Sequence, residues 1–325
     1  MTTLQERPTL WRRWKERPQS VWLRKAVFQV HLWCGIGVGL YVFIVSVTGS
    51  IVVYRNELYA ATQRAPVVLA ASGPRLSDAE LRAAASRAHP GETVTGIRDS
   101  TRADQPVYVT FTRAAAITER LFNPYTGEDL GEPNPPLYRF VTWLLSLHDD
   151  LLGGETGRSV NGIGALLVIL LVCTGVIVWW PGVQTWRRSL MVRRHVGWRR
   201  FTWDLHSMVG FWTLGIVLMF AVSGAYLCFP EAFQSIADWL QPLTAENATS
   251  RGVDKVLYWL AYLHVGRVYG IALPCSGPGV CDQATKLAWA FFGLAPAVMF
   301  VTGVIMWWNR VVRKRVRRSR PARVA

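Results

Sequence analysis

The sequence predicts an all-α membrane bundle of four transmembrane helices, built from two duplicated helix pairs, with a small α+β domain outside the membrane. The prediction rests on long apolar stretches, a repeated pattern of histidines and glycines, and a polar segment between the first two stretches. A spanning helix needs about 20 consecutive apolar residues. Four stretches of the 325-residue chain meet this requirement without a single Asp, Glu, Lys or Arg: 31–54, 159–180, 205–229 and 287–308.

The net charge of +15 is concentrated in three segments, namely the one before the first stretch, the loop after the second and the C-terminal tail. If four spans alternate in direction, all three segments lie on the same side of the membrane. Lys and Arg close to span ends mark the cytoplasmic side. We therefore expect both termini in the cytoplasm, and we expect membrane lipid rather than nucleic acid to be the partner of the basic residues.

The four spans divide the chain into nine segments. The segments between and beyond the spans are of two kinds: three basic segments expected on the cytoplasmic side, and two larger polar segments expected on the outer side. They are a basic segment (1–25), the first spanning helix (26–54), an outer domain (55–136), a short interfacial helix with the second spanning helix (137–180), a basic loop (181–204), the third spanning helix (205–229), a second outer segment with an interfacial helix and a cysteine loop (230–285), the fourth spanning helix (286–309) and a basic tail (310–325).

The outer domain has the pattern of a small α+β unit. Residues 76–88 are expected to form a helix with Ser77 as its N-cap and Glu80 completing a capping box. Strand-like runs follow at 93–97, 107–112 and 117–122, and the last run ends in the turn sequence NPYTGE. In the second outer segment, Cys275 and Cys281 could form a disulfide in an oxidising compartment, or remain a free pair.

The two halves of the chain repeat one pattern. HLWCGIGVGLYVFIVSVTG begins at His31, and HSMVGFWTLGIVLMFAVSG begins at His206. TWLLSLHDDLLGG and YWLAYLHVGRVYG carry His148 and His264, and both precede a span that ends in Thr-Gly and a Trp pair. Two matching pairs of histidine-containing helices indicate a duplicated unit.

The four histidines of the repeat fall at two membrane depths, with His31 and His206 at the cytoplasmic side and His148 and His264 at the outer side. Histidines inside spanning regions are rare and usually functional, and neutral imidazole is a common axial ligand of haem iron. We therefore predict two haems, each bound by two histidines. A single histidine at a helix end is more often an interfacial residue, and the repetition of the pattern favours ligation.

Four glycines complete the predicted sites. Gly49 and Gly224 each lie 18 positions after a repeat histidine, which is about 27 Å along a helix. This places them near the outer surface, at the depth of His148 and His264, and Gly175 and Gly303 fall near the inner surface, at the depth of His31 and His206. Small residues would make room for a flat porphyrin, although close helix packing alone could also explain them.

Haem propionates attract cations. The outer candidates are Arg158 and Arg267, and the inner ones are Lys25, Arg199 and Arg200.

These motifs resemble the PepSY-associated transmembrane family over about residues 21–310, and LFNPYTGEDLG resembles the end of the PepSY module. The resemblance implies a PepSY-like periplasmic domain and a place in the bacterial inner membrane. It also implies a likeness to iron-regulated ferric-siderophore reductases with two bis-histidine b-type haems, whose ligands would fall on His31, His148, His206 and His264. The compact second outer segment and the cysteine loop depart from the family pattern.

The leading hypothesis is an oxidoreductase that passes electrons from an unidentified donor on the cytoplasmic side to a periplasmic acceptor such as a ferric siderophore. No flavin or nicotinamide motif is evident in the sequence. The alternatives are a haem-free, membrane-anchored PepSY module that binds peptide or restrains a peptidase, and a small transporter. Transporter sites lie near the membrane midplane, whereas these histidines lie near its surfaces.

Overall fold

The structure is a computed structural model that describes residues 9–62, 69, 73–99, 102–114, 116–244, 251–267 and 280–313. The chain forms two compact units, one from Met1–Tyr54 with Leu144–Ala325 and the other from Arg55–Trp143. Cys275 lies outside the described residues, as does the side chain of Cys281, so the disulfide stays a prediction.

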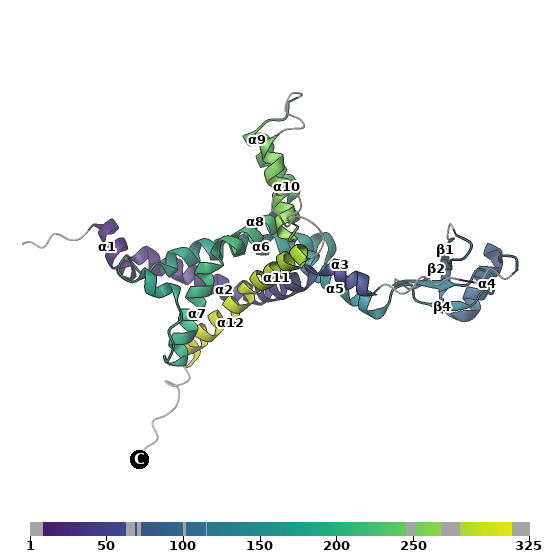
Figure 1. The fold of residues 1–325 in the computed structure, drawn as a ribbon, viewed down its shortest axis with the longest axis horizontal. Coiled ribbons are helices and arrows are strands. Elements are labelled where there is room, and N and C mark those ends of the chain that lie inside the picture. Colours follow the sequence, from purple (N-terminus) through teal and green to yellow (C-terminus); the bar gives the residue numbers. More distant parts are fainter. Residues whose placement is uncertain are drawn as a thin grey trace, which may run out of the picture. The chain divides into compact units, whose positions relative to one another are not determined.

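The first unit is helical (Figure 1). Within it, α2 contacts α6 and α12, α6 contacts α8, and α7 contacts α12. Helix α5 begins in the other unit and ends in this one. The helices are α1 (Leu10–Glu16), α2 (Trp22–Val52), α5 (Pro136–Asp150), α6 (Gly154–Trp179), α7 (Trp198–Trp212), α8 (Leu214–Cys228), α9 (Pro230–Leu240), α10 (Gly252–His264), α11 (Val280–Gly293) and α12 (Ala295–Trp307), with short turns η1 (Pro18–Ser20), η2 (Trp186–Leu190) and η3 (Trp308–Val312).

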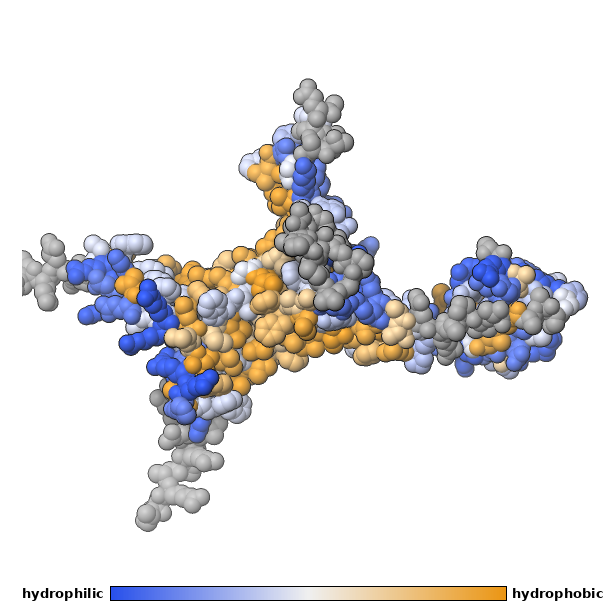
Figure 2. Space-filling view, in the orientation of Figure 1, coloured by the Kyte–Doolittle hydropathy of each residue, from blue (hydrophilic) through white to orange (hydrophobic). Residues whose placement is uncertain are grey.

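Three helical segments of the described chain are long and apolar enough to cross a membrane: α2, α6 and the segment Asp282–Val312, which contains α11 and α12. A fourth span results if α7 and α8 together make one. Their sides expose large apolar residues such as Leu40 (63% exposed) and Val301 (44%). Figure 2 shows this apolar surface in orange, with hydrophilic residues around α1 and the beginning of α7. The chain is therefore a membrane protein whose spanning helices contact lipid.

The third predicted span is not one continuous helix. It is divided into α7 and α8, which are bent by 64°. Thr213 lies at the break, and its Oγ1 donates a hydrogen bond to the Val209 carbonyl at 2.8 Å. Gly210 and Gly215 flank the break. Threonine back-bonding and nearby glycines are common causes of helix bending, and an apolar stretch alone does not reveal the bend.

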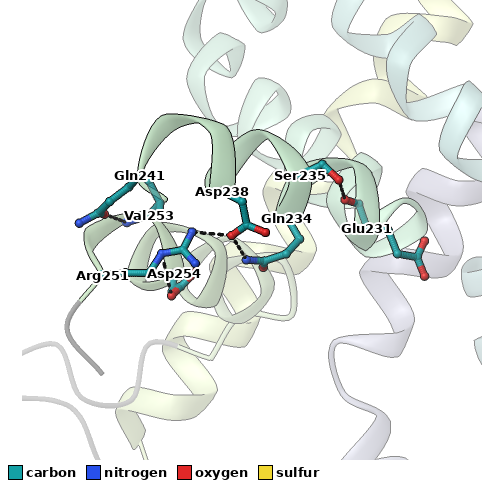
Figure 3. Close-up of polar contacts among 8 residues, drawn as sticks. All are labelled: Glu231, Gln234, Ser235, Asp238, Gln241, Arg251, Val253 and Asp254. Carbon is teal, nitrogen blue, oxygen red and sulfur yellow. Dashed lines mark hydrogen bonds and ion pairs between the residues drawn. The ribbon is translucent and has the colours of Figure 1, made fainter. Parts of the chain in front are cut away.

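A helical hairpin, α9 and α10, follows α8, and its first helix was not predicted. Arg251, directly before α10, joins the two helices: its guanidinium donates to Asp238 Oδ1 at 2.7 Å and pairs with Asp254 in the first turn of α10 (Figure 3). Gln234 donates to the same Asp238 oxygen at 3.0 Å. The Arg251 side chain is only 2% exposed, so the ion pair fixes the beginning of the helix that ends at His264.

The second unit combines helices α3 (Arg55–Thr62) and α4 (Asp78–Ala88) with an antiparallel sheet of strand order β1-β2-β3-β4. The strands are β1 (Thr93–Arg98), β2 (Val107–Arg113), β3 (Ala116–Phe122) and β4 (Asp129–Gly131). Alternate residues of β2 are buried with Leu81 and Ala85 of α4. The helix and the first three strands match the sequence prediction, while the three-residue β4 was missed.

The capping box predicted for α4 is present. The Ser77 N–H donates to Glu80 Oε2 at 2.8 Å, and the Glu80 N–H donates to Ser77 Oγ at 3.4 Å. The Ser77 hydroxyl also donates to Glu80 Oε2, at 2.7 Å. This bond and the one from the Ser77 N–H lower the pKa of Glu80, because they stabilise its carboxylate form. The box therefore fixes the beginning of the helix that covers the sheet.

Asp129 on β4 accepts hydrogen bonds from three groups. They are the Arg120 guanidinium at 2.9 Å, the Gly131 N–H at 2.8 Å and His89 Nε2 at 2.8 Å. Burial acts to raise the pKa of Asp129, but these bonds outweigh it, and the pKa lies below its ordinary value. The folded unit therefore favours the carboxylate.

We expect Asp129→Asn to destabilise the second unit by about 1.5–3 kcal/mol at pH 7, the range for hydrogen bonds to a charged group. Because the folded-state pKa is depressed, the carboxylate's contribution is complete above the unfolded-state pKa and is lost as the pH falls through the folded-state value. Hydrogen exchange of residues 76–131 in the whole protein, at pH 7 and pH 3, measures both effects. The exposed neighbour Glu128→Gln serves as the control, and equal exchange in the two variants would contradict the prediction.

Candidate functional site

Each of the four repeat histidines contacts a hydroxyl group through its Nδ1 atom. The hydroxyl belongs in every case to the Thr or Ser that precedes one of the four predicted glycines. The Nδ1–Oγ distances are 3.1 Å for His31 and Thr174, 3.2 Å for His148 and Thr48, 2.8 Å for His206 and Thr302, and 2.8 Å for His264 and Ser223.

The direction of these hydrogen bonds follows from the hydroxyl groups. Each hydroxyl is buried and donates its proton to the carbonyl four residues earlier in its own helix, at distances of 2.6–2.8 Å. The oxygen is then left to accept, so the imidazole nitrogen must donate. His148 Nδ1 also lies 3.1 Å from the Val45 carbonyl, which can only accept. The proton therefore resides on Nδ1, and Nε2 keeps its lone pair.

The second nitrogen of each ring is available for a ligand. Within the described residues, no hydrogen bond involves the Nε2 atom of His31, His148, His206 or His264. A neutral imidazole held through Nδ1–H, with a free Nε2, is the form in which histidine binds metals.

The four glycines lie directly against the imidazole rings. A Cβ atom at Gly49 would lie 2.7 Å from His148 Cε1, and one at Gly175 would lie 3.3 Å from His31 Cε1. The corresponding distances are 3.4 Å for Gly224 and His264, and 3.7 Å for Gly303 and His206. The depths agree with those predicted from helix rise, and the structure adds which glycine contacts which histidine. The contact differs from the prediction, however, because the glycines accommodate the imidazoles themselves.

The histidines meet in two pairs. The rings of His148 and His264 have centroids 6.2 Å apart and planes inclined by 39°. His31 and His206 line one cavity of about 520 Å³. Each Nδ1–hydroxyl contact joins a histidine to a hydroxyl in the same half of the chain. Each histidine pair, in contrast, takes one histidine from each half.

The cavity beside His31 and His206 has a mostly apolar wall with cations among its lining residues. Arg199 lines it, as does Arg310, whose guanidinium lies 4.5 Å from the centre of the Phe28 ring. Trp179 and Trp307, which occupy equivalent positions in the two halves, line it as well. This cavity has the size and character typical of cofactor pockets, which measure about 300–1,000 Å³.

The model of the PepSY-associated TM region matches residues 28–252 and 242–310, which cover most of the chain. The chain belongs to the PepSY-associated transmembrane family. It also resembles an uncharacterized protein of Pseudomonas aeruginosa, with 33% identity over 85 residues. That alignment covers 25% of this chain and 20% of the relative, so the chain matches about a fifth of the relative's length.

The described residues of this family member fit a bis-histidine haem on two counts. With metal–nitrogen bonds of about 2 Å and about 1.2 Å from nitrogen to ring centre, two rings on opposite sides of one metal would have centroids about 6.4 Å apart. The separation of His148 and His264, 6.2 Å, is close to this value. The donor set also fits, since all four rings offer an unprotonated Nε2. Among the described residues, no cluster of three or more His, Cys, Asp or Glu could hold a metal ion.

The predicted propionate partners lie in different settings. Arg158 donates to the Leu227 carbonyl through Nη2 at 2.6 Å and Nε at 3.2 Å, so its guanidinium is tied to the end of α8. The backbone N–H of Arg267 donates to the Tyr262 carbonyl. Among the inner candidates, Arg199 lines the cavity, while Arg200 pairs with the buried Asp204 at 2.8 Å. Arg310 was not predicted as part of the site.

The hydroxyl residues Thr48, Thr174, Ser223 and Thr302 were not predicted as site residues either. Their signal was present, because each stands directly before a predicted glycine. Thr-Gly and Ser-Gly dipeptides also occur where membrane helices pack closely, so the sequence alone does not distinguish the two roles. Their role emerges only when the histidine on a neighbouring helix is placed beside them.

The glycine contacts predict different effects for alanine at two of the four glycines. Alanine in a helix gains about 1 kcal/mol over glycine, and Gly303→Ala makes an ordinary contact, so we expect stability to hold or rise. Gly49→Ala would push against His148, which we expect to cost about 1–3 kcal/mol. Thermal unfolding in detergent measures both, and equal melting temperatures for the two variants would contradict the geometry.

Proposed function

We propose that the protein is a transmembrane oxidoreductase that carries electrons through its helix bundle between two haem b sites. His31 and His206 would hold one haem, and His148 and His264 the other. The observation that carries the proposal is the fourfold hydroxyl contact, because it leaves a free lone pair on Nε2 in all four rings.

The chain's own groups would hold each ligand ring in one orientation and one protonation state. The hydroxyl and the neighbouring carbonyl retain the proton at Nδ1, and the glycine lets the ring approach the adjacent helix. Bound there, b-type haem would supply one-electron chemistry at both ends of the bundle. Gly49 lies against His148 and is 18 residues from His31 on one helix, so the two sites are about 27 Å apart along α2.

The bundle would carry electrons across the bacterial inner membrane from the cytoplasmic to the periplasmic side. Both termini would lie in the cytoplasm and the PepSY-like unit in the periplasm. The concentration of Lys and Arg in 1–25, 181–204 and 310–325 supports this orientation. A reduced carrier in the cytoplasm or membrane would donate electrons on the His31/His206 side.

A ferric chelate, such as a ferric siderophore, is the proposed acceptor on the His148/His264 side. Each ferric ion would take one electron and become ferrous, and no bond of the chelator would break. Hard oxygen ligands bind the divalent ion more weakly than the trivalent one, so reduction would release the iron. The resemblance to ferric-siderophore reductases supports this choice of acceptor.

We expect the purified protein to contain two haems per chain and to show the absorption of low-spin haem in oxidised and reduced forms. His31→Ala and His206→Ala should each remove the same haem, and the double variant should keep one. Combining His31→Ala with His264→Ala should remove both. His195→Ala, outside the repeat, is the control.

A colourless protein from haem-replete cells would reject the proposal and favour a haem-free PepSY module. Unchanged haem content in the histidine variants would reject the ligand assignment instead.

Proteoliposomes test the acceptor. With a reductant enclosed on the side of the basic segments, addition of a ferric siderophore outside should reoxidise the protein and form ferrous iron, trapped by a ferrous-specific chelator. His264→Ala should abolish this reaction, while the control His195→Ala should retain it. Reoxidation by oxygen but not by any ferric chelate would show that the acceptor is of another class.

A further inference from the structure

The two helices that carry His148 and His264 end against side chains from neighbouring helices. Asn161 on α6 donates through Nδ2 to the carbonyls of His148, at 2.8 Å, and Asp149, at 3.0 Å. Trp289 on α11 donates through Nε1 to the carbonyl of Leu263 at 2.5 Å. The last carbonyls of a helix have no partner within it, and these donors bind such carbonyls at or next to each ligand histidine. The Leu263 carbonyl also accepts from the Gly266 N–H, at 3.2 Å.

Asn161 and Trp289 occupy the same position in the duplicated pattern. Asn161 lies 13 residues before Thr174, and Trp289 lies 13 residues before Thr302, the two hydroxyls that contact His31 and His206. In each half, one candidate span (α6, or the segment containing α11 and α12) contacts a histidine of one pair through a hydroxyl. The same span binds the end of a helix of the other pair through a side-chain N–H. An amide performs this task in the first half and an indole in the second.

Asn161 is itself fixed in place. Tyr41 of α2 donates its hydroxyl proton to Asn161 Oδ1 at 2.7 Å, which orients the amide so that Nδ2 faces α5. Glycines allow this approach: a Cβ at Gly164 would lie 2.2 Å from the Tyr41 ring, and one at Gly157 would lie 1.8 Å from the Asp150 carbonyl oxygen. The end of α5 thus packs against α6 without an intervening side chain.

Trp289 braces the other helix by its ring as well as by its N–H. A Cβ at Gly266, just after α10, would lie 3.2 Å from Trp289 Cδ1. Phe220 lies edge-on to both Trp289 and His264, with centroid distances of 6.3 and 6.0 Å. The indole therefore lies against the chain before and after His264, at Leu263 and at Gly266.

We infer that Asn161 and Trp289 are positioning residues that set the orientation of the His148 and His264 rings, with Tyr41 orienting Asn161. Both histidines lie in the last turn of a helix, where the backbone is least constrained by its own hydrogen bonds. The hydroxyl contact fixes one atom of each ring, and the side-chain donor fixes the backbone from which the ring projects. The consequence for a bound metal rests on the proposed function, whereas the bracing does not.

The first experiment needs no haem. Asn161→Leu and Trp289→Phe keep much of the side-chain volume and remove the donor, and Tyr41→Phe removes only the hydroxyl that orients Asn161. We expect amide hydrogen exchange to rise about tenfold in residues 145–152 for Asn161→Leu and in residues 261–267 for Trp289→Phe. Tyr41→Phe should give a smaller rise in residues 145–152. Trp239→Phe on α9, which is 80% exposed, is the control.

The second experiment reads the ring orientation in the haem-loaded protein. The electron paramagnetic resonance g values of an oxidised bis-histidine haem depend on the angle between its imidazole planes. We expect Asn161→Leu and Trp289→Phe to shift the signal and midpoint potential of the His148/His264 haem, and to leave those of the His31/His206 haem unchanged as an internal reference.

These outcomes separate the inference from the proposed function. Unchanged exchange at both helix ends would overturn the inference, as would equal shifts of both haem signals, because that result indicates a general loosening of the bundle. If Asn161→Leu fails to fold, Tyr41→Phe and Trp289→Phe decide the question. A protein without haem would reject the proposed function, and the exchange measurements would still decide whether these residues brace the helices.

Discussion

A neutral imidazole can carry its proton on either nitrogen, and the hydrogen bond between Nδ1 and a Thr or Ser hydroxyl fixes that choice at four places in this bundle. The hydroxyl can only accept, because its own proton is bonded to a carbonyl one turn earlier. A buried N–H without an acceptor would cost about 1–3 kcal/mol. The same bond thus satisfies a polar group in an apolar bundle and directs the free lone pair away from the helix that supplies the hydroxyl.

The connectivity of these four contacts explains how a duplicated chain makes two sites. Every contact lies within one half, as between α2 and α6 or between α7 and α12. Every histidine pair is completed only when the halves come together, as His148 and His264 do across the boundary. Neither half contains a complete pair by itself, so packing of the halves and formation of the sites are one event.

Helix geometry accounts for what could be predicted from the sequence. The rise of 1.5 Å per residue is rigid, so the 18-residue spacing from His31 to Gly49 correctly placed that glycine at the depth of His148. The strands and the Ser77 cap followed from local patterns in the same way. The depth of a residue along a helix does not determine which way the helix is rotated or where the side chain points. The contact between Thr48 and His148 was therefore not predicted.

Other features depend on tertiary contacts that leave little trace in one sequence. The bend at Thr213 follows from a single hydroxyl bond within an apolar run, and Arg310 looks like any other residue of a basic tail until it lines the cavity. Asn161 and Trp289 share a position but no chemical likeness. Their equivalence is not visible when the two halves are aligned by residue type. It becomes visible because both side chains donate to a carbonyl at a helix end.

The likeness of the four contacts has an energetic consequence for the proposed electron pathway. Because the ligand rings are held alike, a difference in affinity for an electron between the two sites must come from their surroundings. Arg199 and Arg310 line the cavity of His31 and His206, and cations stabilise an added electron there. That stabilisation opposes transfer toward His148 and His264. In the proposed orientation the membrane potential, negative inside, favours the same transfer by about 2.3 kcal/mol per charge for each 100 mV. The membrane potential would therefore offset the stabilisation of the electron by Arg199 and Arg310 at the His31/His206 site.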